Sequence, residues 1–304
     1  MEYRENYGIL LSVAIIAILL LISTIPYIIE VRGEEKHKLL WKRSLRDYVF
    51  GVCWDPNGEK LIAVGLFLKV SVFNRGGNIV WEVESEDFTG CPSINPNGKY
   101  LVVLVGNYGL YFYSLSSGEI VYKTRIDHTI WSTCWSNSGK YIAVGCKYGY
   151  LYLYRWLGNK AQAIWERRVA EDGISSVCFH PLRDDRLALG SKDHHVYLVD
   201  SEGEVLWKRE LDGWVYDVCY SPEGEYIAAV TDSGSIHVLK AENGEIVDKD
   251  RSTEALNSVV WFDGYIITGD GYGTVYVYLW RNEKLKQIYK FQAAQKWILV
   301  DDGL

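Results

Sequence analysis

The chain has 304 residues, of which 48% are hydrophobic and 14% aromatic, and its formal net charge is −7. A chain of this size can bury one large core or two ordinary domains. Acidic and basic residues are interspersed without a Lys/Arg-rich patch, so the composition argues against a nucleic-acid partner. The single Met, few Gln and many Ile, Tyr, Glu and Lys resemble the bias of thermophile proteins.

An uncharged apolar run lies near the N-terminus. A short tail, residues 1–7, precedes residues 8–29, which are nearly all Ile, Leu, Val or Ala. As a helix this run would be ~33 Å long, enough to cross the ~30 Å hydrocarbon core of a bilayer. A cleaved signal peptide is the alternative, but the run lacks a basic start and exits through Pro26 and Tyr27. The sequence therefore predicts one transmembrane helix over residues 8–29.

The charges that flank this run predict its orientation. A charged linker, residues 30–37, follows the run, and only Arg4 precedes it as a basic residue. The basic residues beyond it are Arg32, Lys36, Lys38, Lys42, Arg43 and Arg46. The positive-inside rule then places the C-terminal domain in the cytoplasm. The expectation is a single-pass membrane protein with a cytoplasmic domain.

Residues 38–304 contain an internal repeat with a period of about 40 residues. Six segments share one pattern, and they begin at Val49, Thr89, Ile130, Ile174, Val215 and Leu256. Turn glycines mark the period, at Gly58, Gly98, Gly139, Gly224 and Gly264. Asp184 and Asp185 stand at this turn in the fourth segment, so the fourth segment differs locally from the others.

Each segment contains four short runs that are typical of strands. In the first segment, "VCW" is followed by the turn "DPNG" and then by the apolar run "KLIAVG". The third run alternates aromatic residues, as in "LYFYS" and "TVYVYLW", and a Gly turn leads to a fourth run such as "VLWKRE". Four antiparallel strands per segment of this length are typical of a β-propeller blade. The predicted fold is all-β, with six four-stranded blades after one transmembrane helix.

The chain ends in "WILVDDGL", which matches the first run of the sixth segment, so a seventh unit begins at about residue 292. At the other end, "KLLWKRS" (38–44) has the pattern of a fourth strand. Two arrangements stay open. Six blades close the ring, or the ring is open and its unfilled edge accepts a strand from a partner. The open six-bladed propellers of the COPII coat are the family analogy for the second arrangement.

Two stretches, Trp54–Val64 and Tyr220–Val230, resemble WD40 repeats, and residues 191–211 resemble the quinoprotein-like (PQQ-like) propeller repeat. The resemblance extends over about residues 39–304; it implies a β-propeller and says little about function. The chain departs from the WD40 pattern, because no Gly-His precedes the first strands and no Trp-Asp closes a blade. The blades are therefore expected to depend mainly on apolar and aromatic packing.

Five cysteines lie in the first strands of successive repeats. Cys53, Cys134, Cys178 and Cys219 occupy equivalent positions, and Cys91 falls two residues early, which predicts the same strand face. No C-x₂-C spacing indicates a soft-metal site, so we interpret these cysteines as small buried residues near the axis. Trp81, Trp165 and Trp207 recur after turns, and we interpret them as residues that pack between blades.

The sequence contains no motif that predicts catalysis. It lacks a nucleophile elbow, an H-E-x-x-H helix, a P-loop, and the adjacent Cys-Cys pair typical of PQQ-dependent dehydrogenases. Asp193–His195 ("DHH") could bind a metal, but neighbouring residues on a strand point to opposite faces. We therefore predict no enzyme, no cofactor and no metal site.

Aromatic residues recur in the turn between the second and third strands. They are Phe67, Tyr108, Tyr148 and Tyr272. Tyr and Phe are enriched in interface cores, so these residues are predicted to contact a partner protein, unless they only pack between blades. The terminal strand adds four candidates for strand addition, Trp297, Ile298, Leu299 and Val300.

The predicted function is a membrane-anchored, non-catalytic β-propeller that acts as a protein-protein interaction scaffold or as a subunit of a membrane-associated complex. The alternative is an envelope-facing quinoprotein-like domain that binds or processes a small ligand, such as a sugar or a redox cofactor. The side of the membrane on which the propeller lies distinguishes the two.

Overall fold

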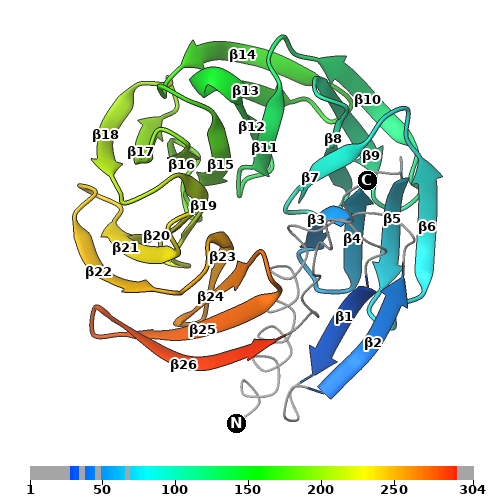
Figure 1. Ribbon diagram of the computed structural model, residues 1–304. Coiled ribbons are helices and arrows are strands. Elements are labelled where there is room, and N and C mark those ends of the chain that lie inside the picture. The colour runs from blue at the N-terminus through cyan, green and yellow to red at the C-terminus, as the bar shows by residue number, and fades with distance from the viewer. Residues whose placement is uncertain (1–27, 34–37, 45–48, 66–68, 293–304) are drawn as a thin grey trace, which may run out of the picture.

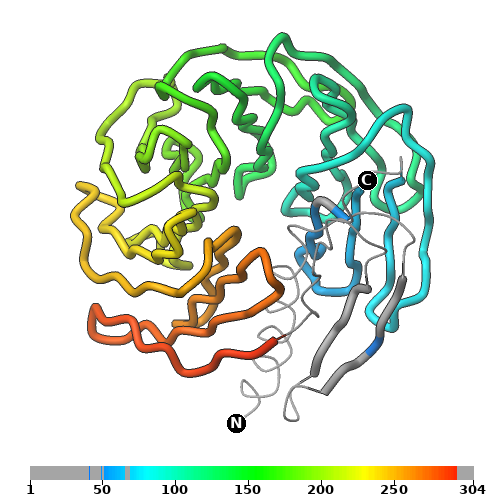
Figure 2. The backbone as a smooth tube through the Cα atoms, in the orientation of Figure 1, coloured from blue at the N-terminus to red at the C-terminus, as the bar shows by residue number. Residues whose placement is uncertain are grey.

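The computed structural model describes residues 28–33, 38–44, 49–65 and 69–292. This part of the chain forms six four-stranded antiparallel sheets and one two-stranded sheet. The four-stranded sheets are arranged around a common centre, as the ribbon and the backbone trace show (Figures 1 and 2). The prediction of an all-β fold with six four-stranded blades is confirmed.

The six blades follow one another along the chain, four strands to a blade. Blade 1 contains β3 (Val49–Trp54), β4 (Lys60–Gly65), β5 (Lys69–Asn74) and β6 (Ile79–Glu84). Blade 2 contains β7 (Thr89–Ile94), β8 (Tyr100–Val105), β9 (Gly109–Ser114) and β10 (Ile120–Arg125). Blade 3 contains β11 (Ile130–Trp135), β12 (Tyr141–Cys146), β13 (Tyr150–Trp156) and β14 (Ala161–Arg168), with the 3₁₀ helix η2 (Lys147–Gly149) between β12 and β13.

The second half of the ring repeats this plan. Blade 4 contains β15 (Ile174–Phe179), β16 (Arg186–Ser191), β17 (His195–Asp200) and β18 (Val205–Glu210). Blade 5 contains β19 (Val215–Tyr220), β20 (Tyr226–Thr231), β21 (Ser235–Lys240) and β22 (Ile246–Arg251). Blade 6 contains β23 (Leu256–Phe262), β24 (Tyr265–Asp270), β25 (Thr274–Arg281) and β26 (Lys284–Gln292).

Within each blade the strands are hydrogen-bonded in sequence order, and the first strand lies nearest the centre (Figure 1). First strands of successive blades contact each other from β3 through to β23. Second strands are buried on both faces because neighbouring blades cover them, which explains their continuous apolar runs, as in β8. The fourth strands are mostly exposed, as in β18.

Turn glycines end the first strand of five blades. Gly58, Gly98, Gly139, Gly224 and Gly264 have φ values of 67°, 67°, 69°, 79° and 76°. Only glycine adopts this left-handed conformation without a steric penalty. The sequence period marked by these residues is therefore a period of tight turns.

Three tryptophans on the fourth strands of blades 1, 3 and 4 join these blades to the ones that follow. Their indole Nε1 atoms donate hydrogen bonds to backbone carbonyls of the following blade: Trp81 to Leu115 (2.9 Å), Trp165 to Ser201 (2.8 Å) and Trp207 to Ala241 (3.0 Å). A Cβ atom added at Gly118 or Gly244 would come within 3.0 Å of the Trp81 or Trp207 ring. The predicted role of these tryptophans in packing between blades is confirmed.

The two-stranded sheet pairs β1 (Ile28–Gly33) with β2 (Lys38–Ser44). Residues 28–29 were predicted to end the transmembrane helix, which is wrong because Ile29 pairs with Arg43 of β2. Residues 30–33, predicted to begin the charged linker, continue the same strand. The rest of the predicted tail, helix and linker, residues 1–27 and 34–37, lies outside the described residues. No helix in the described ranges is both long and apolar enough to span a bilayer.

Trp41 on β2 repeats the contacts of the fourth-strand tryptophans. Its Nε1 donates to the carbonyl of Arg75 (2.9 Å), and its ring centroid lies 6.0 Å from that of Phe73 in blade 1. A Cβ atom on Gly77 would lie 2.6 Å from the Trp41 ring. The hairpin β1–β2 thus has the place of the outer half of a further blade beside blade 1 (Figure 1). Residues 293–304, which contain most of the predicted seventh first strand, lie outside the described residues.

Each blade also has a polar contact that the sequence did not predict. It involves the third residue of the third strand and a carboxylate or histidine: Ser71–Glu82 (2.8 Å), Tyr111–Glu86 (2.8 Å), Tyr152–His128 (2.6 Å), Tyr197–Asp193 (2.6 Å), His237–Asp212 (3.1 Å) and Tyr276–Asp270 (3.1 Å). Because the acceptors come from different loops and strands, no fixed sequence motif marks them. Apolar packing is therefore supplemented by one buried or half-buried polar pair per blade.

Candidate functional site

The candidate site is one face of the ring. Since the strands alternate in direction in every blade, all turns between second and third strands and all loops between blades open on the same face. We call it the aromatic face, defined by Tyr108, Tyr148, Trp214 and Tyr272, whose exposed fractions are 38%, 56%, 41% and 44%. These side chains are not buried between blades. The other predicted contact residues, Phe67 and Trp297, Ile298, Leu299 and Val300, lie outside the described residues.

The backbone around η2 holds Tyr148 outward. Tyr148 has φ 63° and ψ 21°, a left-handed conformation that is unfavourable for a residue with a Cβ atom. The next residue, Gly149, lies so close to the Ala170 carbonyl that a Cβ atom would not fit. The Arg168 Nε donates a hydrogen bond to the Tyr148 carbonyl (3.0 Å). The surrounding contacts therefore maintain a strained residue at the surface.

Cations lie beside the aromatic rings of this face. Lys147 Nζ is 4.7 Å from the ring centroid of Tyr148, and the Arg125 guanidinium is 5.8 Å from that of Tyr108. Such pairs are attractive because the ring face carries negative charge. Tyr, Trp and Arg are the residues enriched in binding hot spots.

Trp214 was missed in the sequence. It lies in the loop between blades 4 and 5, where its backbone N–H donates to Asp232 (2.8 Å). Lys192 Nζ lies 5.2 Å from the Trp214 ring and 4.4 Å from the Trp131 ring, so one cation connects two blades. A tryptophan directly before a first strand, outside the repeat pattern, was the signal that could have identified it.

Tyr272 borders a cavity of about 480 Å³ at the outer side of blade 6. Asp270 and Lys290 contribute charged groups to its walls. The Gln292 side chain donates to the Tyr272 carbonyl (2.6 Å), which fixes the turn against the last described residue. This cavity extends the aromatic face over the edge of the ring.

The first-strand cysteines differ in their pKa shifts, since a hydrogen bond with Cys178 lowers the pKa of Cys134. Cys53, Cys134, Cys178 and Cys219 are free, half-buried thiols. Burial raises the pKa of Cys53 and of Cys219, so both stay protonated at neutral pH. Cys91, which was predicted to lie on the same strand face as the others, lies in a β-bulge between Gly90 and Ser93 and has a φ of 46°.

The "DHH" stretch forms a structural turn between β16 and β17. The Asp193 carboxylate accepts hydrogen bonds from the Tyr197 hydroxyl (2.6 Å) and from the backbone N–H groups of Glu171 (2.8 Å) and His195 (3.1 Å). Although burial opposes it, these bonds lower the pKa of Asp193. In the described ranges, no three His, Cys, Asp or Glu side chains gather in a metal-binding arrangement.

The six four-stranded sheets around a common centre identify the fold as a β-propeller. Two family models match parts of the chain: "Anaphase-promoting complex subunit 4 WD40 domain" over residues 177–264, and "WD domain, G-beta repeat" over residues 120–155. Neither model covers half of the chain.

Curated relatives agree with these matches at low identity. THO complex subunit 3 of Arabidopsis thaliana is 22% identical over 78% of this chain and 76% of its own length. Abnormal embryogenesis protein 30 of Caenorhabditis elegans is 33% identical over 24% of this chain, and Intraflagellar transport protein 122 homolog of Xenopus tropicalis is 22% identical over 84%. The matched regions span only 8% and 22% of the last two proteins.

Solved structures share the fold. A chain of the Mitotic Checkpoint Complex superposes with a TM-score of 0.72 at 14% identity, covering 81% of both chains. The β-propeller domain of Cps50 (Swd1) from Myceliophteria thermophila superposes with a TM-score of 0.70 at 10% identity, covering 80% of this chain and 85% of that one. At such identities the likeness concerns the fold alone.

The chain is a β-propeller, and parts of it are similar to WD40 repeats. The comparisons give no support to the quinoprotein-like resemblance. WD40 scaffold propellers bind other proteins in complexes and are generally non-catalytic.

Proposed function

We propose that this protein is a membrane-anchored scaffold that binds a partner protein through the aromatic face. The exposure of Tyr108, Tyr148, Trp214 and Tyr272 on one face carries the proposal. Rigid propellers present such loops without reordering the backbone on binding, which lowers the entropic cost of association. The strained Tyr148 supports the same face, since backbone strain is commonly maintained at functional positions.

The names of the relatives support a role within an assembly. THO complex subunit 3, the relative that this chain matches over most of both lengths, is named as a subunit of a complex. We infer that this chain is likewise one subunit of a larger complex, and that its partner packs apolar groups on the exposed rings and acidic groups beside Lys147 and Lys192.

Photo-crosslinking tests the aromatic face directly. p-Benzoylphenylalanine is placed at position 148 or 272 of the full chain in native membranes, and at position 289 as the matched control. Tyr289 is 56% exposed but lies on the outer strand β26. Crosslinks to one protein at 148 and 272, and not at 289, support the proposal. Equal crosslinking at all three positions overturns it.

The membrane anchor is proposed from the uncharged run of residues 8–27. The flanking basic residues support a cytoplasmic propeller. Protease treatment of sealed, right-side-out vesicles tests both points. Protection of the propeller supports the proposal, whereas digestion without detergent places the propeller outside.

Completion of the half-blade β1–β2 is a second way in which a partner could bind. Only β1 and β2 pair in this sheet within the described chain, while all other sheets have four strands. A strand added by a partner near residues 292–304 would extend the hairpin by backbone hydrogen bonds. Deleting residues 293–304 should leave blades 1 to 6 folded and abolish this binding, and unchanged binding of the partner would exclude the mechanism.

A further inference from the structure

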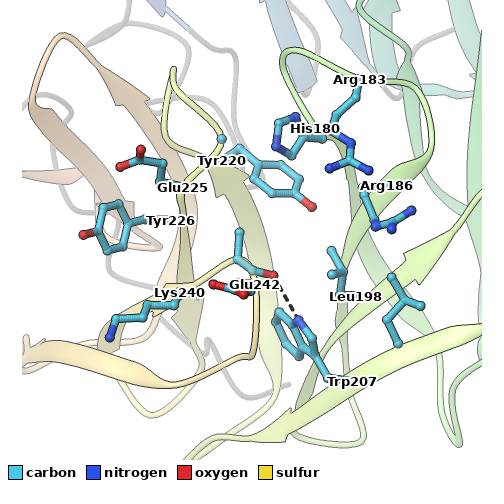
Figure 3. A pocket seen from close by; sticks show the side chains of 13 residues that line it. His180, Arg183, Arg186, Leu198, Trp207, Tyr220, Glu225, Tyr226, Lys240 and Glu242 are labelled. Atoms are coloured by element: carbon cyan, nitrogen blue, oxygen red, sulfur yellow. Dashed lines mark hydrogen bonds between the residues drawn. The ribbon is translucent and has the colours of Figure 1, made fainter.

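A cavity of about 760 Å³ lies between blades 4 and 5. The first-to-second-strand turns of both blades and the third-to-fourth-strand turn of blade 5 contribute to its walls, so it opens on the face opposite the aromatic face (Figure 3). Its volume lies within the range of small-molecule sites, roughly 300–1,000 Å³. We call it the 4–5 cavity. Because it is separate from the aromatic face, its function is independent of the scaffold function proposed above.

One repeat position carries side chains of different size at the junctions, with Trp156 and Trp280 at two of them and Leu115 and Ala241 at two others. Trp156, Ala241 and Trp280 are equivalent, since each donates its backbone N–H to the carbonyl of the residue that precedes the second strand of its blade, at 2.8, 2.9 and 2.7 Å. The Trp156 ring stacks on Phe112 of blade 2 at 4.8 Å, and the Trp280 ring contacts Tyr226 of blade 5 at 5.2 Å. Ala241 has only a methyl group at this position. An indole from this position therefore fills two junctions, whereas the junction of blades 4 and 5 contains the Trp207 indole of blade 4 and a cavity beside it.

A second repeat position changes from aromatic to cationic at the same junction. The second strand begins with Tyr100 in blade 2 and with Tyr226 in blade 5, whereas it begins with Arg186 in blade 4. Arg186 Nη1 donates to the carbonyl (2.7 Å) and the carboxylate (3.0 Å) of Asp185. No described residue accepts a hydrogen bond from its Nε or Nη2. Arg186 thus keeps donors for a ligand in the cavity wall.

The Asp185 carboxylate accepts hydrogen bonds from two arginines in this wall. Asp185 also accepts two hydrogen bonds from Arg183, at 2.7 and 2.8 Å. The wall formed by blade 4 is therefore cationic, while blade 5 contributes Glu225, Glu242 and Lys240, the last of which pairs with Glu245 at 2.9 Å (Figure 3). This separation favours a ligand with one negative charge, which is directed toward blade 4, over a multiply charged phosphate.

The hydroxyl of Tyr220 provides the independent sign of a ligand. Tyr220 is 6% exposed, and its hydroxyl has no hydrogen-bond partner among the described residues. Figure 3 shows this hydroxyl directed into the space between the arginines and Trp207. Buried hydroxyls are almost always hydrogen-bonded, because leaving one unpaired loses the bond it made with water. A ligand oxygen in the cavity would restore that bond.

We propose that the 4–5 cavity binds a ligand that carries one carboxylate on a planar aromatic body. The carboxylate accepts hydrogen bonds from Arg186 and from the Tyr220 hydroxyl. The aromatic body occupies the space beside the small Ala241 side chain and packs on Leu198 and Trp207. A free aromatic acid and an adjacent Trp-Glu pair in a partner peptide share this chemistry.

Isothermal titration of the full chain with indole-3-acetate tests the proposal. Its matched probe is indole-3-acetamide, which has the same shape without the charge. We expect the amide to bind at least about tenfold more weakly, because it loses charge-assisted hydrogen bonds. A blocked peptide, acetyl-Gly-Trp-Glu-Gly-amide, is the third probe, and the tighter of acid and peptide identifies the source of the carboxylate. Equal affinity for acid and amide, or no binding of either carboxylate probe at millimolar concentration, overturns the proposal.

Four variants assign the binding to the cavity. Arg186→Gln and Tyr220→Phe should each weaken indole-3-acetate by about tenfold. Arg155→Gln and Tyr278→Phe are the matched controls and should bind as the wild type does. Arg155 is exposed in blade 3, and the Tyr278 hydroxyl is likewise buried without a partner in the described chain, but neither residue lines the cavity.

Ala241→Trp places the indole of blades 3 and 6 in the cavity and should abolish binding. Thermal unfolding of each variant shows whether it is folded. If Ala241→Trp does not fold, Tyr220→Phe still tests the proposal, since it removes a single oxygen atom. Wild-type affinity in Tyr220→Phe or in a folded Ala241→Trp overturns the assignment.

Discussion

The junction between blades 2 and 3 and the junction between blades 4 and 5 are formed by equivalent strands. They differ in the side chains that lie between the blades. At the first, Tyr100, Phe112, Trp135 and Trp156 form a cluster whose ring centroids lie 4.8–6.1 Å apart. At the second, Arg186 and Ala241 replace two of these rings, and a cavity of about 760 Å³ takes their place. The repeat therefore specifies where strands lie, while single substitutions decide whether a junction is filled or hollow.

The largest expected effect is a loss of stability when an aromatic side chain is removed from the filled junction between blades 2 and 3. Trp156→Ala removes a ring that contacts Tyr100, Phe112 and Trp135. We expect a loss of about 3 kcal/mol in the free energy of unfolding, because burial and ring contacts are both lost and a cavity remains. Urea denaturation followed by circular dichroism measures it. A loss below 1 kcal/mol would mean that the cluster collapses around the gap.

The two junctions should also differ in how tightly their turns are packed. Gly224 in blade 5 and Gly139 in blade 3 have φ values of +79° and +69°, so alanine is strained at both. A Cβ atom at Gly224 would lie 2.3 Å from the His180 ring, whereas at Gly139 it would lie 3.4 Å from Pro96, an ordinary contact. We expect Gly139→Ala to cost about 1 kcal/mol and Gly224→Ala about 2 kcal/mol. Equal losses of thermal stability would show that His180 moves aside freely.

Filling the hollow junction should cost little. Extra atoms in a packed core typically cost 1–3 kcal/mol, but Ala241→Trp enters an existing space. We expect its midpoint of thermal unfolding to equal or exceed that of the wild type. A clear drop would indicate that the cavity walls do not accept an indole, in contrast to the junctions at Trp156 and Trp280.

The smallest effect concerns acid stability, to which Asp185 at the hollow junction contributes. Hydrogen bonds from Arg183 lower the pKa of Asp185 to about 2. Its folded-state pKa is thus below the unfolded value near 3.9, so Asp185 stabilises the fold above about pH 4 and loses this contribution as the pH falls toward 2. The pair is half exposed, so the contribution is well below about 1 kcal/mol. Asp185→Asn should flatten the stability profile between pH 4 and 2, with no difference from wild type in the slope above pH 5.

Two tyrosine variants test whether the hollow junction binds a ligand. Tyr220→Phe and Tyr278→Phe each remove a buried hydroxyl without a partner in the described chain, so both should leave stability within about 1 kcal/mol of the wild type. Only Tyr220→Phe should weaken indole-3-acetate. This pair of variants separates a ligand-binding role from a purely structural one.

Much of the fold could be predicted from the sequence because the relevant signals are local and repeated. Turn glycines such as Gly58 and Gly98, the alternating third strands and the tryptophans Trp81, Trp165 and Trp207 recur in the same register, and the structure places each as expected. A strand pattern that recurs six times is evidence that no single segment could provide. The candidate contact residues Tyr108, Tyr148 and Tyr272 were recognisable for the same reason.

Where tertiary contacts decided the outcome, the local pattern was insufficient. The stretch β1 (Ile28–Gly33) continues an apolar run and was assigned partly to a helix, and only its pairing with β2 makes it a strand. The bulge at Cys91 and the contact between Lys192 and two tryptophans likewise depend on neighbours that are distant in sequence. Periodicity reports which face of an element is buried, but not which element covers it.

The sequence by itself determined the repeat, the six four-stranded units and the position of each strand within a unit. Tertiary structure alone decided what lies between blades. The 4–5 cavity requires Arg186, Tyr220 and Ala241 to meet from two blades, and each of these residues is an ordinary member of its own strand or turn. Local sequence sets the conformation of a strand through its turns and its alternation of residues. The size of a cavity depends instead on the volumes of side chains from two blades, which meet only in the packed ring.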